Sequence, residues 1–231
     1  MDFALLLYDE FSGKSITGAG SVFQIGQRHV DAYVKKDGFY VFSKINQDEF
    51  ELEIHRPHYL SHREQIVISK LDPKHPVVRS RLFRKDNRNF LDCQWFYSKT
   101  IPETDVLIFA EDENIKATVL EAAAEEKVSR LTILSRPAYS LLGRRFSFNP
   151  GKGKGETFLI TQSQGPGVYL ADRLLNHDNL KSVYPVYLSK SLADGKVSIP
   201  CECPEKITKM AYYKKGRRSG KWVSVFAAGR S

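Results

Sequence analysis

Three histidines stand close together in this 231-residue sequence, and their side chains are of a type that binds metal ions. Zinc sites need several imidazole or thiolate ligands that converge at about 2 Å from the ion. The spacing of His55, His58 and His62 would bring the three rings together on a helix, but Pro57 and the strand-like segment before it disfavour a helix. We therefore interpret the three histidines as part of an exposed loop and predict no metal site.

Three cysteines are the next residues that could bind a metal or take part in a reaction. Cys201 and Cys203 are separated by one residue, so on a strand their side chains face opposite sides. A thioredoxin-like motif needs two intervening residues, and a metal site would need further ligands, for which Cys93 and His177 are the only distant candidates. We expect reduced thiols, with no disulfide framework and no bound cofactor.

A glycine-rich run at 151–155 superficially resembles a phosphate-binding loop. Such a loop needs a lysine directly after its last glycine and a helix behind it, whereas here Glu156 and Thr157 follow and then a strand-like segment. The sequence also lacks a nucleophile elbow and an H-E-x-x-H motif. We predict that the protein is not an enzyme and has no catalytic residues. An enzyme or ligand-binding domain in the C-terminal half is the alternative.

Basic side chains gather in three segments. The first holds Arg79, Arg81, Arg84, Lys85 and Arg88, and the second holds Arg144, Arg145, Lys152 and Lys154. The third interleaves basic with aromatic residues and is the predicted partner-binding site, comprising Tyr212, Tyr213, Lys214, Lys215, Arg217, Arg218, Lys221 and Trp222. This composition fits a hairpin with a turn at Ser219–Gly220 that contacts protein. A solvated hairpin tip, or a site that stacks and neutralises nucleic acid, remains open as an alternative.

Residues 3–71 are dense in strand signals. Several short segments alternate apolar and polar residues with period two, as in Phe50, Leu52 and Ile54 separated by charged residues. Asp37–Gly38 lies between two such segments and predicts a hairpin, because glycine tolerates positive φ. The stretch with Pro73 and Pro76 is typical of a linker. We predict a β-sandwich domain at residues 2–72.

These residues also resemble a known family. The order is Asp9, then the segments 13–16 and 18–19, then Asp37-Gly38-Phe39-Tyr40-Val41-Phe42 and a late Tyr59. It resembles the carboxypeptidase-regulatory-like, or transthyretin-like, domain over about residues 3–71. The resemblance implies an N-terminal Ig-type β-sandwich that serves as an accessory or adhesive module. It departs from the family pattern at Ser12, Ser15 and residues 57–59.

The remainder, residues 77–231, has mixed signals. Strand-like segments occur at 105–111 and 128–134, and four more follow in the last 50 residues. Between them, residues 113–127 place Ile115, Val119 and Ala122 at helical spacing in an Ala- and Glu-rich stretch, which predicts a helix. A second short helix is predicted at 168–177. We therefore expect a C-terminal β-rich α+β interaction domain.

Composition and charge set the last bounds. The chain is 42% hydrophobic and 27% charged, with a net charge of +8, and it has no apolar run long enough for a transmembrane helix. No export signal is recognisable at Met1, so we predict synthesis in the cytoplasm and no membrane insertion. Together with the resemblance, these features predict a mainly β, non-catalytic structural or adaptor protein. Its partners would be other protein subunits, as in a phage-tail-like or virion-like particle, with nucleic acid as the less favoured partner.

Overall fold

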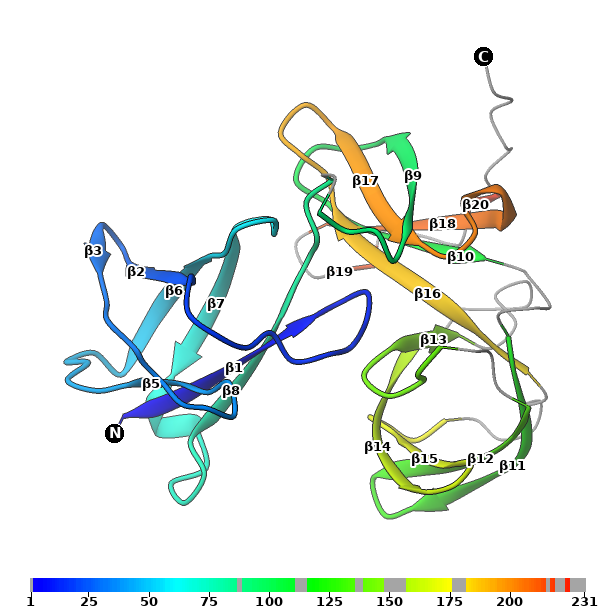
Figure 1. The fold of residues 1–231 in the computed structure, drawn as a ribbon, viewed down its shortest axis with the longest axis horizontal. Coiled ribbons are helices and arrows are strands. Elements are labelled where there is room, and N and C mark those ends of the chain that lie inside the picture. The colour runs from blue at the N-terminus through cyan, green and yellow to red at the C-terminus, as the bar shows by residue number, and fades with distance from the viewer. Residues whose placement is uncertain are drawn as a thin grey trace. The chain divides into compact units, whose positions relative to one another are not determined.

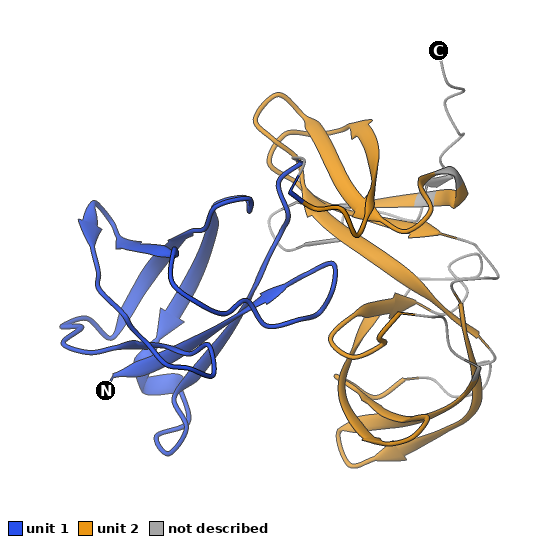
Figure 2. Cartoon of the chain, in the orientation of Figure 1, with its two compact units in different colours: residues 1–89 blue, residues 90–231 orange. Residues whose placement is uncertain are grey.

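The structure is a computed structural model that describes residues 2–86, 89–110, 116–135, 139–147, 157–175, 182–214, 217–218 and 223–224. These residues form two compact units, residues 1–89 (unit 1) and 90–231 (unit 2), shown separately coloured in Figure 2. Strands dominate both units. The only helices among the described residues are one-turn 3₁₀ helices, η1 at Ile68–Lys70 and η3 at Pro204–Lys206. Neither has the length needed to cross a membrane.

Unit 1 consists of two four-stranded sheets with one hydrophobic core (Figure 1). The first sheet has the order β4-β5-β1-β8 and the second the order β3-β2-β6-β7. Their strands are β1 (Phe3–Asp9), β2 (Val22–Ile25), β3 (Arg28–His29), β4 (Tyr33–Val34), β5 (Tyr40–Phe42), β6 (Glu49–His55), β7 (His62–Val67) and β8 (Val77–Leu82).

The core of unit 1 follows from period-two alternation. On β6, Phe50, Leu52 and Ile54 are buried, and the residues between them are exposed or half-buried, as the sequence predicts. Phe3 of the central strand β1 stacks on Phe42 of β5, with 4.6 Å between ring centroids. Side chains of both sheets therefore meet in a single apolar layer.

The predicted turn at Asp37–Gly38 is confirmed. Gly38 has φ +89, and its N–H donates to the carbonyl of Lys35 at 3.0 Å. This turn joins β4 to β5, which pair antiparallel.

Unit 1 extends beyond the predicted residues 2–72. Strand β8 pairs in parallel with β1 from Ala4↔Val77 to Asp9↔Leu82, so it completes the first sheet of unit 1. The segment with Pro73 and Pro76 leads into this strand and does not separate the two units.

Unit 2 contains the remaining strands, all of which pair antiparallel. They are β9 (Gln94–Lys99), β10 (Asp105–Ala110), β11 (Ala117–Glu125), β12 (Val128–Ser135), β13 (Arg145–Ser147), β14 (Thr157–Gly165), β15 (Val168–Ala171), β16 (Ser182–Lys190), β17 (Lys196–Cys201), β18 (Ile207–Lys214), β19 (Arg217–Arg218) and β20 (Val223–Ser224).

Six of these strands close into a ring. The order is β11-β12-β15-β14-β13-β16, and β16 returns to β11 through Ala117↔Val183 and Thr118↔Ser182 (Figure 1). The interior is filled by apolar side chains from all six strands, among them Val119, Leu131, Phe146, Phe158, Tyr169 and Val183. Closure removes exposed edges along the paired part of the ring.

Strand β16 connects this ring to the rest of unit 2. Beyond its pairs with β11 and β13, its second half pairs with β10 from Phe109↔Val186 to Asp105↔Lys190. Strand β10 is buried along nearly its whole length and pairs on its other side with β18. The two-stranded sheet β9–β17 packs beside β16, where the Ser189 hydroxyl donates to the carbonyl of Ser198 at 3.0 Å.

Both predicted helices are wrong, and unit 2 is not an α+β domain in its described part. Residues 117–125 form strand β11, and 168–171 form strand β15. On β11 the inward residues are Ala117, Val119 and Ala122, because a bulge adds one residue between the last two. A spacing of two followed by three imitates helical periodicity, which explains the error.

Candidate interaction surfaces

The predicted partner-binding segment begins as a β-hairpin. Strand β18 pairs with β19 through Tyr213↔Arg218 and Lys214↔Arg217, so residues 215–216 connect the two strands. Tyr212 pairs with Val106 of β10 on the other side of β18. The structure describes only the backbone of these residues. The remaining predicted contacts, Lys215, Lys221 and Trp222, and the expected turn at Ser219–Gly220, lie outside the described residues.

The first basic segment is largely engaged within unit 1. Arg84 is 5% exposed and donates from Nε to Asp9 at 2.8 Å, while Arg81 forms an ion pair with Glu10. Arg79 and Lys85 are exposed, and Arg88 lies outside the described residues. This segment is therefore not a continuous free basic surface.

The second basic segment is likewise not a surface patch where the structure describes it. Arg144 forms an ion pair with Glu202, and the side chains are 11% and 19% exposed. Its guanidinium lies over the ring of Tyr139 at 4.3 Å from the centroid. Arg145 is half-buried on β13, and Lys152, Lys154 and the glycine-rich run 151–155 lie outside the described residues. The strand expected after that run is present as β14.

The three clustered histidines contact different partners. His55 contacts Ser61 at 3.0 Å, His58 contacts Asn89 at 2.9 Å, and His62 contacts Glu64 at 3.1 Å. Among the described residues, no three His, Cys, Asp or Glu side chains gather where they could hold a metal ion.

The three cysteines form no disulfide in the described part of the chain, and the topology draws them to one region. Cys201 is buried at the end of β17 and pairs with Gln94, the residue after Cys93. Cys203 and Cys93 are half-buried. Only Cys201 lies on a strand, because the chain turns into η3 directly after Cys203.

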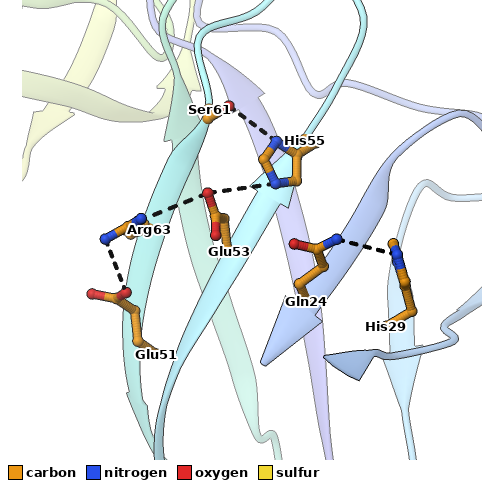
Figure 3. A network of polar contacts seen from close by, with 7 residues as sticks. All are labelled: Gln24, His29, Glu51, Glu53, His55, Ser61 and Arg63. Atoms are coloured by element: carbon orange, nitrogen blue, oxygen red, sulfur yellow. Dashed lines mark hydrogen bonds and ion pairs between the residues drawn. The ribbon is translucent and has the colours of Figure 1, made fainter. Parts of the chain in front are cut away.

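The outer face of the sheet β3-β2-β6-β7 carries a polar network (Figure 3). Glu53 lies 3.8 Å from Arg63 and 3.5 Å from His55, and Arg63 also contacts Glu51 at 3.5 Å. These side chains satisfy one another across the β6–β7 pair. Such exposed ion pairs add little stability, and they make this part of the face polar.

The closed ring of unit 2 presents the opposite character on part of its outer face. Leu120 of β11 and Leu134 of β12 are 64% and 67% exposed. Both stand at register shifts of the β11–β12 pair, on either side of the inward pair Val119↔Ile133. Bulges re-aim side chains in this way and tend to occur near functional sites. Neither leucine was predicted as an exposed position, because β11 was assigned to a helix and the register shift at Leu134 leaves no signal in the sequence.

Neighbouring residues extend this apolar feature. Thr132 of β12 pairs with Val168 of β15, and Leu170 of β15 pairs with Arg130. Inward residues alternate with these positions, so Val168 and Leu170 share the outer face with the exposed leucines. We call Leu120, Leu134, Val168 and Leu170 the outer leucine strip. Val168 and Leu170 are half-buried, so Leu120 and Leu134 supply most of its exposed surface.

Comparison with known proteins adds no family assignment. No protein-family model matches the sequence, and a search of curated proteins finds no significant match.

Proposed function

We propose that this protein is a non-catalytic structural or adaptor component that binds other protein subunits in a larger assembly. The observation that carries the proposal is the outer leucine strip, where Leu120 and Leu134 are 64% and 67% exposed. Exposed apolar side chains that gather on one face are typical of protein interaction sites.

Energetics favour burial of the strip against a partner. Fully burying a leucine side chain contributes about 1.5 to 3 kcal/mol. Because Leu120 and Leu134 are mostly exposed, most of this free energy is still to be gained when a partner covers them. The strip is built on paired strands of a closed ring, so its side chains are held in place before binding. A preorganised surface loses less entropy on association than a loop does.

The β18–β19 hairpin is the second proposed contact. Its sequence combines Tyr212 and Tyr213 with Arg217 and Arg218, residue types enriched at binding hot spots. The same composition also suits nucleic acid, which would bind through phosphate contacts and stacking. The hairpin supports the proposal only if its partner is a protein.

The N-terminal unit suits an accessory role in such an assembly. Two four-stranded sheets around one core support the further proposal that unit 1 is an Ig-type, transthyretin-like sandwich. Domains of that type commonly serve as adhesive modules, and the role of each is set by its surface and not by its fold.

A pull-down from native lysate tests the proposed function. We expect the wild-type chain to recover one or a few stoichiometric protein partners that resist nuclease treatment. Leu120→Asn/Leu134→Asn should lose them while keeping its unfolding midpoint, because both side chains are largely exposed. The matched control Leu192→Asn, at a leucine that is 50% exposed between β16 and β17, should retain them.

The hairpin is tested in the same experiment with Arg217→Ala/Arg218→Ala. Weaker recovery of the same partners, with a slower association rate, is the expected result for charged residues at an interface rim. Recovery of nucleic acid alone, with affinity that falls steeply as salt rises, would contradict the proposal.

A further inference from the structure

A pocket with a volume of about 480 Å³ opens on unit 1. It lies between the β2–β3 hairpin and the segment that follows β5, and its volume is within the range of small-molecule sites. Its polar lining includes Arg28, His29, Lys44, Asn46 and Gln47, and Ile45 contributes to its apolar lining. The pocket thus combines cationic groups, amide donors and a hydrophobic wall.

Two cations in this pocket have no anionic partner. Within the described part of the chain, neither Arg28 nor Lys44 forms an ion pair, and both are exposed. Asp31 is the one acidic residue in the lining, and it pairs with neither of them. The pocket therefore carries unneutralised positive charge, which favours an anionic ligand.

The segment 43–48, most of which lines the pocket, is fixed at two points. The N–H of Ile45 donates to Asp2 at 2.7 Å. The N–H and hydroxyl of Ser69 each donate to Asp48 at 2.7 Å. Both carboxylates are thereby engaged, and they line a neighbouring pocket. Lys44 directly precedes the first of these points and has φ +63, an uncommon value for a residue other than glycine.

His29 is oriented by Gln24, its neighbour across the β2–β3 pair. Figure 3 shows the side-chain amide nitrogen of Gln24 in contact with Nε2 of His29, at 3.2 Å. This contact holds the imidazole ring of His29 against Gln24 of β2.

We propose that this pocket binds a small phosphorylated molecule. Arg28 offers a planar fork of N–H donors that matches phosphate oxygens, and Lys44 adds a second positive charge. The amide groups of Asn46 and Gln47 and the side chain of Ile45 would contact the uncharged part of the ligand. The site lies in unit 1, so it is independent of the outer leucine strip in unit 2.

Titration of the full-length chain, followed by amide NMR shifts, tests the site with glucose 6-phosphate, inorganic phosphate and glucose as probes. We expect both phosphates to shift the amides of residues 26–30 and 43–47, and glucose to shift none. Arg28→Gln/Lys44→Gln should weaken binding at least about tenfold, because two charged contacts are lost. Lys35→Gln/Lys36→Gln, which removes two exposed lysines outside the pocket, should leave binding unchanged.

Three results would overturn the proposal. One is no shift at these amides up to about 10 mM of either phosphate, a concentration that detects even very weak binding. Another is equal binding by wild type and Arg28→Gln/Lys44→Gln. The third is an equal loss in both double variants, which would indicate general charge attraction in place of a built site.

Discussion

Asp9 is the centre of a buried polar group in unit 1. It accepts from the N–H of Ser12 at 2.8 Å, the hydroxyl of Tyr59 at 2.9 Å and Nε of Arg84 at 2.8 Å. Burial raises the pKa of Tyr59, and the negative charge of Asp9 raises it further, so the phenol stays protonated and donates. The sequence did not predict this group, since its members are separated by up to 75 residues.

Removing one partner of this group should destabilise unit 1. Asp9 and Arg84 are 4% and 5% exposed, so Arg84→Met leaves a buried carboxylate without its counter-charge. We expect the free energy of unfolding to fall by about 3 to 5 kcal/mol. Urea unfolding of the full-length chain, followed by NMR signals of unit 1, measures this.

Two matched variants test the cause. Arg63→Met removes exposed contacts with Glu51 and Glu53 and should change the same free energy by less than about 1 kcal/mol. Asp9→Asn/Arg84→Met should recover part of the loss, because it leaves no uncompensated charge. Equal effects of Arg84→Met and Arg63→Met would show that the buried pair has no special role.

The turn at Gly38 was predicted correctly from the sequence. Its surroundings allow the effect of a substitution on the free energy of unfolding to be predicted. A Cβ at Gly38 would lie 2.9 Å from Cγ2 of Thr17, and φ is +89. Gly38→Ala should lower the free energy of unfolding by about 2 kcal/mol or more, since strain and a close contact add.

Gly26 is its control, because φ is +61 and a Cβ there would meet nothing within 4 Å. Gly26→Ala should cost only about 1 kcal/mol of backbone strain in the same urea assay. A larger loss at Gly26 than at Gly38 would contradict the role assigned to Thr17.

Among the elements, β11 shows why a strand was taken for a helix. Local sequence supplies Ala and Glu, which favour helices, and the bulge breaks the period-two pattern between Val119 and Ala122. What decides the outcome is pairing with β12 on one side and with β16 on the other. The pairing with β16 is non-local, because it joins Ala117 to Val183, so no local window of the sequence contains it. Strands with an unbroken local pattern were predicted, such as β6 with its period-two alternation and β1 with its continuous apolar run.

The Arg144–Glu202 pair links two parts of unit 2. Arg144 directly precedes β13 of the ring, and Glu202 directly follows β17 of the two-stranded sheet. Burial, followed by the charge of Glu202, raises the pKa values of Tyr139 and Tyr187 beside it. Both tyrosines therefore remain neutral around one buried ion pair.

Loss of this link should weaken unit 2. Glu202→Gln leaves the guanidinium of Arg144 buried without a counter-charge, and we expect the free energy of unfolding of unit 2 to fall by about 3 kcal/mol. Tryptophan fluorescence during urea unfolding reports it, since Trp95 lies on β9. Arg130→Met, which removes a more exposed contact with Glu125 at 3.2 Å, should change it by less than about 1 kcal/mol. Equal losses would contradict the linking role.

At the scale of the whole molecule, the division into two units was foreseeable, and its position was not. Two prolines in the segment 73–76 predict a break in regular structure, and the chain does lack strands there. The following strand β8 nevertheless belongs to unit 1, because it pairs in parallel with the first strand of the chain. A parallel pair between the first and last strands of a unit leaves no local signal.

The closed ring was equally hidden from the sequence. Its strands do not follow one another in chain order, since β15 lies between β12 and β14. The outer leucine strip exists only because this order brings β11, β12 and β15 side by side. The candidate site could therefore be found only after the topology was known, whereas the segment 212–222 was visible in the sequence as a run of basic and aromatic residues.

Photo-cross-linking from the outer leucine strip tests directly whether this surface binds another protein. A photoreactive amino acid replaces Leu134 in the full-length chain, and a control chain carries it at Gln162, an exposed residue of β14. We expect one discrete, nuclease-resistant protein adduct from position 134 in native lysate and none from position 162. No adduct at 134, or the same adducts from both positions, would contradict it.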